Sequence, residues 1–330
     1  MPNNWFVLLN PISFLGILVL IGYISEKCKY VANIRENLSK TIVHITLPLL
    51  VITALCSQNI EDICFTDAII VFFSAIFCVS ALLCINHLVA RLLKIPENRR
   101  VIHTLLGSFG NVIYLGFPVV LHLFGETGLL YAIIFSMGND LLVWTYAVHK
   151  LDKERCKNAE TVGIRQAKWN LRYLINPNTL SFLIGISLLL LGLKIPEILY
   201  KPLHSLGQAT VPLSMLFIGA ILARTELIKS IKQASIWSIV FIKMLLFPML
   251  LLLAFRYVLS FVGLDVMLES SKTLLFAVVN TQVAMPTQIN LSVLSEKYQN
   301  DTEYVAQTIF CTTLCSAFTL PAVLLFAMSI

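Results

Sequence analysis

The sequence predicts an all-α polytopic membrane protein with ten transmembrane helices, arranged as a 5+5 inverted repeat with broken, crossing helices 4 and 9. Three observations predict this fold: an apolar composition, ten apolar segments in a row, and helix-breaking residues that recur in two of them. Hydrophobic residues make up 58% of the 330 residues and charged residues only 13%, whereas an ordinary soluble domain is about 45–50% apolar. We therefore expect the lipid bilayer to surround this chain.

Ten segments reach the length of roughly 20 mainly apolar residues that a membrane-spanning helix needs. No basic region precedes the first segment, which predicts a retained helix and not a cleaved signal. The segments run roughly over residues 6 to 24, 41 to 56, 68 to 92, 101 to 124, 128 to 149, 173 to 193, 203 to 223, 234 to 259, 273 to 294 and 305 to 327.

The fourth and ninth segments carry residues that interrupt a helix. The fourth contains Gly110, Gly116 and Pro118, and the ninth contains Asn280 six residues before Pro286. Proline removes one backbone bond and clashes with the preceding turn, and glycine weakens a helix interior. Inside a bilayer, freed backbone groups are tolerated only where protein buries them or a wet cavity meets them. A matched pair of broken helices therefore predicts a binding site near the middle of the membrane.

Proline placement also indicates an internal repeat. Three pairs of sites match at offsets of 166, 164 and 168 residues: Asn10-Pro11 with Asn176-Pro177, Leu47-Pro48 with Val211-Pro212, and Pro118 with Pro286. We predict a five-helix repeat over residues 1–149, a basic linker over 150–172, and a second five-helix repeat over 173–330. Because five is odd, the second repeat is inverted, which is typical of secondary transporters that work by alternating access.

The basic residues predict the orientation. Most of the 24 lysines and arginines fall in loops on one side, and the other side receives only Lys194, Lys201, Arg256 and Lys272. Lys and Arg gather on the cytoplasmic side of membrane proteins. We therefore expect a multi-pass protein of the plasma (inner) membrane with both termini extracytoplasmic, and we expect no nucleic-acid partner.

Asn111 and Asn280 are the leading candidates for substrate contacts. They occupy equivalent places in the two broken segments, and each side-chain amide can donate an N–H to a carboxylate. The ends of interrupted helices also attract anions. The alternative is that both asparagines only cap the half-helices that follow them.

Further polar and aromatic residues of the two segments are candidates for the same site. Gln282 and Thr287 either line a cavity or bond to a neighbouring helix. Tyr114 either borders the substrate or packs between helices. Pro118 and Pro286 complete the predicted set because they shape the two breaks.

Asp140 and Lys243 are charged residues deep in apolar segments, and they are the coupling-ion candidates. A charge there costs roughly 2.5 kcal/mol or more unless it is paired or hydrated. Asp140 is either a proton or sodium site or half of a static ion pair with Lys243; if Lys243 instead faces a cavity, it would attract anions. No catalytic motif and no metal-ligand spacing occurs, so we expect no enzyme, cofactor or metal site.

A set of motifs follows in a specific order along nearly the whole chain. They are Gly110-Asn111 through Gly116-Phe117-Pro118, Leu123-Phe124-Gly125-Glu126-Thr127-Gly128, Gly138-Asn139 to Trp144, Asn176-Pro177, Leu206-Gly207-Gln208-Ala209-Thr210-Val211-Pro212-Leu213, Lys243 ahead of Pro248, and Pro286 followed by Thr319-Leu320-Pro321. This pattern resembles the auxin efflux carrier family of membrane transporters. The resemblance implies a crossing of helices four and nine, a scaffold of helices one, two, six and seven, carboxylate substrates near the crossing asparagines, and a homodimer. Family members are linked to auxin in plants and to malate or malonate in bacteria, and the short central loop is similar to the compact bacterial type.

Together these observations predict a secondary transporter that moves a small organic anion, such as a carboxylate, by efflux or facilitated transport. The alternative is a sodium- or proton-coupled symporter or antiporter of the related bile-acid-type fold that uses Asp140. A receptor or a membrane-embedded enzyme is a different class. A receptor does not need matching helix breaks, and an enzyme needs a reactive cluster.

Overall fold

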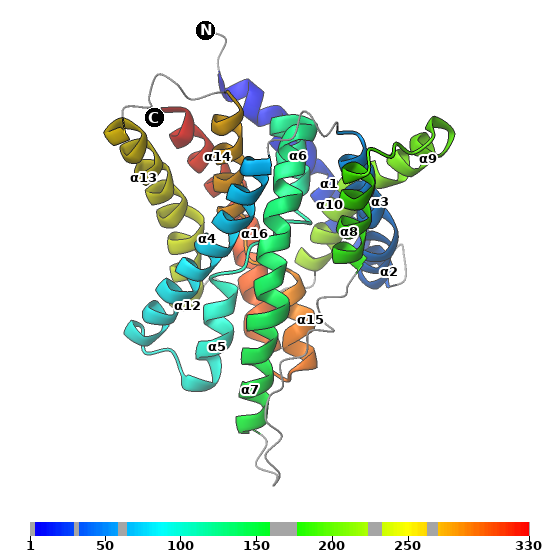
Figure 1. Cartoon of the computed structure of the whole chain (residues 1–330). Coiled ribbons are helices and arrows are strands. Elements are labelled where there is room, and N and C mark those ends of the chain that lie inside the picture. Colours follow the sequence, from blue (N-terminus) through cyan, green and yellow to red (C-terminus); the bar gives the residue numbers. More distant parts are fainter. Residues whose placement is uncertain are drawn as a thin grey trace. The chain divides into compact units, whose positions relative to one another are not determined.

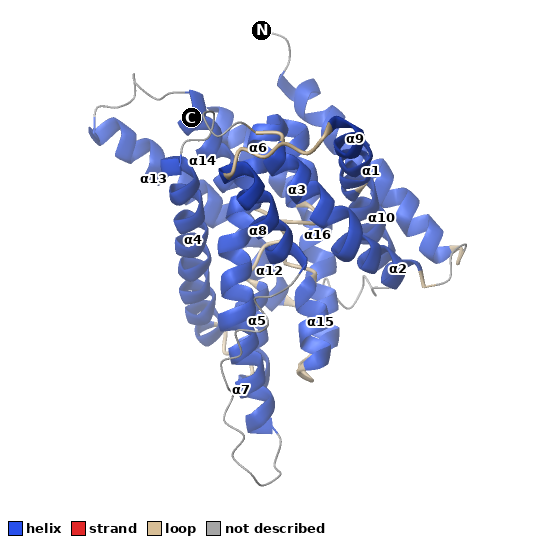
Figure 2. Cartoon of the chain, turned by 45° about the vertical axis from the view of Figure 1, so that its right-hand side comes forward, coloured by secondary structure: helices blue, strands red, loops and turns tan. Residues whose placement is uncertain are grey.

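The computed structural model describes residues 4–29, 33–58, 65–158, 177–223, 233–262 and 270–329. These residues form helices, and apart from one isolated β-bridge they contain no strand (Figure 2). The prediction of an all-α membrane protein is confirmed at this level, whereas the count of ten spans in a 5+5 repeat stays a prediction. Within the described residues six helical stretches are long and apolar enough to cross a membrane: Ile34–Cys56, Phe65–Leu92, Gly116–Arg155, Glu197–Leu222, Ala234–Tyr257 and Thr302–Ala327.

The helices of the predicted first half follow the expected apolar segments closely (Figure 1). The fourth and fifth segments are separated at Gly125, whose φ of 67° and ψ of −162° interrupt the helical backbone. Only glycine adopts such a backbone readily. The elements are α1 (Asn4–Lys27), α2 (Ile34–Thr41), η1 (Ile42–Thr46), α3 (Leu47–Cys56), α4 (Phe65–Leu92), α5 (Glu97–Leu106), α6 (Gly116–Leu142), η3 (Val143–Ala147) and α7 (Val148–Asn158).

The helices of the predicted second half are shorter pieces. They are α8 (Pro177–Leu190), α9 (Glu197–Gln208), α10 (Thr210–Leu222), α12 (Ala234–Phe241), η5 (Ile242–Leu246), α13 (Phe247–Val262), α14 (Ser270–Val283), α15 (Asn290–Lys297) and α16 (Thr302–Ser329). The linker predicted over 150–172 lies largely outside the described residues, because only its start belongs to α7.

The fourth and ninth segments are interrupted, as their glycines and prolines predict. Residues 107–115 between α5 and α6 are not α-helical, and neither are residues 284–289 between α14 and α15. The expected position of Pro118 inside the first break needs correction, because Pro118 lies in the first turn of α6. A proline fits there because the first N–H groups of a helix have no helical partner to lose. Pro286 lies within the second break.

Two wide π-helical turns precede prolines that continue a helix. In η1 the N–H of Leu47 bonds the carbonyl of Ile42, and in η5 the N–H of Phe247 bonds the carbonyl of Ile242. The next residue is a proline in each case, Pro48 or Pro248, which clashes with the carbonyl four residues earlier. Single π turns relieve this clash and are frequent at functional sites. The turn η5 contains Lys243.

The chain divides into two compact units, and each draws residues from both predicted halves. The first unit comprises Met1–Val71, Ile113–Ile134 and Ile175–Arg224. It groups α1, α2, α3, α8, α9 and α10, which are the first, second, sixth and seventh predicted segments, with the start of α4 and the part of α6 up to Ile134. The unit therefore includes the scaffold that the resemblance implies, but it is larger than that scaffold. Within it α1 packs along α10, and α3 packs against α8 and α9 (Figure 1).

The second unit comprises Phe72–Val112, Phe135–Leu174 and Thr225–Ile330. Within it α16 packs against α5, α12, α13, α14 and α15, and α7 packs against α5 and α15. Figure 1 shows α5, α7 and α15 close together. The break after α14 lies entirely in this unit, together with residues 107–112 of the break after α5.

Candidate functional site

The two interrupted segments meet in the second unit. Gly110 and Thr287 form an antiparallel β-bridge. The N–H of Asn111 donates to the carbonyl of Pro286 at 2.7 Å, and the N–H of Gln288 donates to the carbonyl of Phe109 at 3.1 Å. A short piece of sheet pairing thus replaces the helical bonds that both segments lack, which satisfies buried backbone groups as membrane depth requires.

The two interrupted segments approach each other closely at Gly110. A Cβ atom at this position would lie 3.3 Å from the carbonyl oxygen of Gln282 and 3.5 Å from the Cβ of Met285. The 3.3 Å contact is tight for a real side chain, whereas 3.5 Å is an ordinary contact, so glycine eases the pairing of the two backbones here.

Side chains from neighbouring elements bond the carbonyls that the first break frees. Thr287 Oγ1 donates to the carbonyl of Leu106 at 3.0 Å. Asn86 Nδ2 on α4 donates to the carbonyl of Gly107 at 2.8 Å. Lys243 Nζ in η5 donates to the carbonyl of Phe109 at 2.6 Å. Thr312 Oγ1 on α16 also accepts the N–H of Thr287 at 3.3 Å. Three elements besides the two interrupted segments, namely α4, η5 and α16, therefore hold the crossing.

Lys243 is fully buried, and within the described residues its ammonium forms no ion pair. The static pair with Asp140, which was one of two expectations, is not formed; the ammonium bonds a main-chain carbonyl instead. A carbonyl dipole offsets only part of the cost of burying a charge. Burial therefore disfavours the charged form of Lys243, and an anion bound beside the crossing would stabilise that form. Asp140 is buried as well, and one of its oxygens accepts a weak bond from Asn139 Nδ2 at 3.4 Å.

Four buried amide side chains on the two segments have polar atoms without a protein partner. Both side-chain polar atoms of Asn111 and of Gln282 lack a hydrogen bond within the described residues, as do Asn280 Oδ1 and Gln288 Oε1. Each of these side chains is at most 3% exposed. Buried amide atoms are almost always hydrogen-bonded, to protein or to ordered water. This cluster therefore marks the crossing as a place where water or a ligand supplies the missing bonds.

The capping alternative for the two asparagines finds no support. The side chain of Asn111 bonds no N–H group of the chain. Asn280 lies within α14, three residues before its end, and α15 starts without any side-chain cap.

The remaining predicted residues divide between the two units. Gln282, Pro286 and Thr287 lie with Asn111 and Asn280 in the second unit. Tyr114 and Pro118 belong to the first unit. The ring of Tyr114 packs on that of Phe217, with centroids 5.3 Å apart, in agreement with the packing alternative for this tyrosine.

Sequence reasoning missed Asn86 and Thr312, whose side chains hold the crossing. A fully buried asparagine in the apolar α4 is the signal that could have drawn attention to Asn86, since an amide at membrane depth needs a partner. Thr312 is one of many hydroxyl residues on α16 and carries no such signal. Within the described part of the chain, no group of histidine, cysteine or acidic residues is arranged to hold a metal ion.

Comparison with known proteins identifies the class of the chain. Its residues 7–324 match the family model described as membrane transport protein. It is 27% identical over 317 residues to an uncharacterized transporter of Methanocaldococcus jannaschii, covering 91% of this chain and 92% of that protein. It is also 27% identical over 311 residues to a Rhizobium meliloti protein named "Putative malonate transporter", covering 93% of this chain and 92% of the relative. The family and these relatives are transporters and not enzymes, and because the match spans nearly the whole sequence, the chain belongs to this auxin efflux carrier-type family of membrane transport proteins.

Proposed function

We propose that this multi-pass membrane protein is a secondary transporter of a small organic anion, and that the anion's carboxylate binds at the crossing of the two interrupted segments. The observation that carries the proposal is the cluster of unpartnered amides on Asn111, Asn280, Gln282 and Gln288. Amide N–H groups are suitable donors to a carboxylate, and their own oxygens accept bonds from a substrate hydroxyl or from water.

The charge balance of the crossing supports an anionic substrate. Lys243 places an ammonium within 2.6 Å of the Phe109 carbonyl, one residue away from the bridge at Gly110. A buried cation without a carboxylate partner favours binding of an anion, because the anion restores neutrality in a region of low dielectric constant. A neutral or cationic substrate would leave that charge uncompensated.

The proposal includes the finer architecture that the sequence predicts. Ten helices in a 5+5 inverted repeat would alternate the access of the crossing between the two sides of the plasma membrane, with both termini extracytoplasmic and with a homodimer as the assembly. An inside-negative potential favours export of an anion by about 2.3 kcal/mol per charge at 100 mV. Efflux or facilitated transport therefore needs no coupling ion.

Binding is tested by a thermal-stability screen of purified protein against malonate, malate and acetate. Malonate is the first probe because of the name of the Rhizobium meliloti relative. A ligand that binds only the folded state raises the melting temperature, and the rise grows with the logarithm of the ligand concentration relative to its Kd. Asn111→Ala and Asn280→Ala should each weaken binding tenfold or more without loss of folding, whereas the exposed Asn98→Ala serves as the matched control. Unchanged binding in both crossing variants contradicts the proposed site.

Asp140 provides the second candidate mechanism, in which transport is coupled to protons or sodium. Its burial in α6 at membrane depth favours this mechanism, because an ionisable group there is costly and often marks an ion pathway. Transport by Asp140→Asn in proteoliposomes separates the two mechanisms. Loss of ion dependence supports coupling through Asp140, and intact transport driven by the membrane potential alone rejects it.

A further inference from the structure

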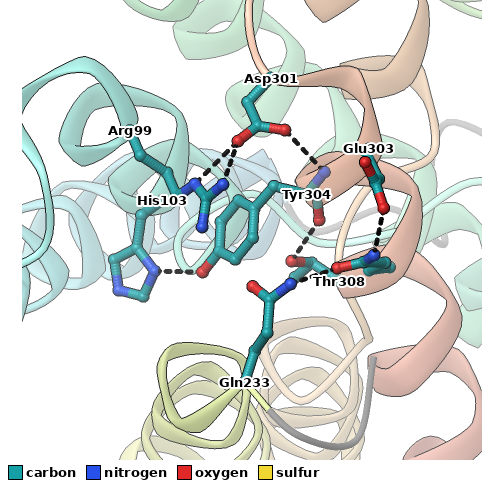
Figure 3. Close-up of polar contacts among 8 residues, drawn as sticks. Arg99, His103, Gln233, Asp301, Glu303, Tyr304 and Thr308 are labelled. Atoms are coloured by element: carbon teal, nitrogen blue, oxygen red, sulfur yellow. Dashed lines mark hydrogen bonds and ion pairs between the residues drawn. The ribbon is translucent and has the colours of Figure 1, made fainter. Parts of the chain in front are cut away.

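A second buried polar cluster lies in the second unit at the start of α16, and the proposed function does not use it (Figure 3). Its centre is His103 on α5, whose side chain is fully buried. Nδ1 of His103 lies 2.8 Å from the hydroxyl of Tyr304, and the two rings are stacked with centroids 6.2 Å apart. Nε2 is buried and has no partner within the described residues, and Figure 3 shows this nitrogen pointing away from Tyr304.

The tyrosine is held firmly, so the histidine ring has a defined orientation. The N–H of Tyr304 donates to Asp301 Oδ1 at 2.9 Å, and its carbonyl accepts the hydroxyl of Thr308 at 2.8 Å. The guanidinium of Arg99 lies over the tyrosine ring, 4.7 Å from its centroid, and forms an ion pair with Asp301 at 2.5 Å. This ion pair joins the opposite charges of Arg99 and Asp301 beside Tyr304.

The charges on the elements packed against His103 are mixed in sign. The helix α5 packs against α7 and α16, and α4 reaches the end of α5 through the bond of Asn86 to Gly107. Gln233, just before α12, bonds Gln307 on α16, and α12 itself carries no charged residue. The charged and titratable side chains on these elements include Glu97, Arg99 and Arg100 on α5; Glu303, Tyr304, Cys311 and Cys315 on α16, with Asp301 just before it; His149, Lys150, Asp152, Lys153, Glu154 and Arg155 on α7; and Asp67, Cys78, Cys84, His87 and Arg91 on α4.

Either neutral tautomer of His103 leaves Nε2 unsatisfied. If the tyrosine donates to Nδ1, then Nε2–H is a buried donor without an acceptor; if Nδ1–H donates to the tyrosine oxygen, then Nε2 is a buried acceptor without a donor. A proton taken up at Nε2 gives an imidazolium with two donors, and burial of that cation is costly unless an anion accompanies it. A carboxylate oxygen at Nε2 supplies both the hydrogen bond and the opposite charge.

We propose that His103 is a proton-binding site that is loaded together with a carboxylate at its Nε2, so that the anion and one proton bind as a linked pair. This inference rests on the proposed function, because it takes the second carboxylate of a transported dicarboxylate such as malonate as the anion at Nε2, while the first binds at the crossing. The proton comes from water on the side to which the site is open and returns to water on release, and no bond of the anion changes. Along the chain, His103 lies one helical turn before Gly107, where the first break begins, and its carbonyl accepts the N–H of Gly107 at 3.0 Å.

The test is calorimetry of malonate binding to the intact protein between pH 6.5 and 8.5, in buffers of different ionisation enthalpy. The wild type should take up a fraction of a proton per malonate that approaches one, and its affinity should rise with falling pH by up to about tenfold per pH unit, the limit for one linked proton. His103→Gln should bind malonate with no proton uptake and with a flat pH profile. His44→Gln, which changes an exposed histidine, should behave as the wild type.

The possible results separate the two proposals. If the wild type binds malonate without proton uptake, the inference fails and the proposed function stands. If proton uptake disappears in Asp140→Asn and persists in His103→Gln, the proton site is Asp140 and the inference fails. If none of malonate, malate and acetate binds the wild type, both proposals fail. Because the pH profile is measured on the unaltered protein, a folding defect in His103→Gln does not prevent rejection of the inference.

Discussion

The two compact units hold their helices together in different ways. In the first unit glycines bring main chains into direct contact: a Cβ atom at Gly22 would lie 2.2 Å from the carbonyl oxygen of Leu216, and one at Gly219 would lie 2.0 Å from that of Val19. These contacts join α1 to α10. Small residues at such crossings let backbones approach closely and favour helix association in membranes.

The second unit relies on polar side chains at its centre. The bonds of Asn86, Lys243 and Thr287 to main-chain carbonyls hold its crossing together. All the unpartnered buried amides of the described residues lie in this unit, whereas the unpartnered buried side chains of the first unit are three hydroxyls, on Thr46, Thr210 and Ser214. Close glycine contacts leave no room for a larger side chain in the first unit. The unsatisfied amides of the second unit can bond a ligand. Mutation of the contact glycines should therefore lower stability, and mutation of the unpartnered amides should lower binding.

The largest effect is expected for Gly219→Val in the first unit. The added side chain collides with the backbone of α1, which cannot give way cheaply, so the loss of folding free energy should reach the upper end of the overpacking range, about 3 kcal/mol or more. The yield and melting temperature of the purified protein measure it. Gly16→Ala on α1 is the control, because a Cβ atom there meets nothing within 4 Å. Equal stability of the two variants would show that the close glycine contacts between α1 and α10 do not stabilise this unit.

Lys243→Met should have the next largest effect, on binding and not on folding. Removal of the ammonium removes a charge-assisted interaction with the anion, worth about 1.5–3 kcal/mol or roughly 10- to 100-fold in malonate affinity. Folding should be preserved, because replacement of a buried charge by an apolar side chain is often neutral or stabilising, and the carbonyl of Phe109 keeps its bond from Gln288. The exposed Lys94→Met is the control. A melting temperature that falls while affinity is unchanged contradicts the proposed role.

The local features of the crossing were predictable, and its long-range contacts were not. Glycine, asparagine and proline placement indicates both breaks because these residues act on their own stretch of backbone. Lys243 was singled out for its charge, but its bond to the Phe109 carbonyl joins residues 134 positions apart. The ion pair of Lys243 with Asp140 was one expectation because both residues need a partner. A sequence shows that need, but it does not show which partner lies nearby.

The lack of information on distant contacts in a sequence also explains the outcomes for Pro118 and His103. Pro118 reads as a helix breaker in any apolar segment, yet a proline also fits a first helical turn, and only the position of the helix start decides between the two. His103 shows no ligand spacing with the other histidines, and its partner Tyr304 is 201 positions away. Its burial and its unpartnered nitrogen become visible only in the fold.

Asn86 and Asn111 offer a sharper comparison within the second unit. Both are buried asparagines, but Asn86 Nδ2 bonds the carbonyls of Leu82 and Gly107, whereas the amide of Asn111 bonds nothing in the described chain. Asn86→Ala should cost about 1–2 kcal/mol of stability, because it leaves a buried carbonyl without a donor. Asn111→Ala should leave stability unchanged or raised and weaken malonate binding. Reduced stability of Asn111→Ala, at the level of Asn86→Ala, would assign both asparagines to the framework.

The smallest effect is expected for Thr287→Val at the bridge itself. Valine keeps the shape of threonine but loses the bond from Oγ1 to the Leu106 carbonyl, so unfolding should become easier by about 0.5–1.5 kcal/mol. The matched control is Thr281→Val on α14, whose hydroxyl bonds the Ala277 carbonyl within its own helix. The Ala277 carbonyl already accepts a helical N–H, so loss of the bond from the Thr281 hydroxyl should lower stability less. If the two variants are equally stable in thermal unfolding, the bond of the Thr287 hydroxyl adds nothing to the main-chain pairing, and Thr287 does not hold the crossing.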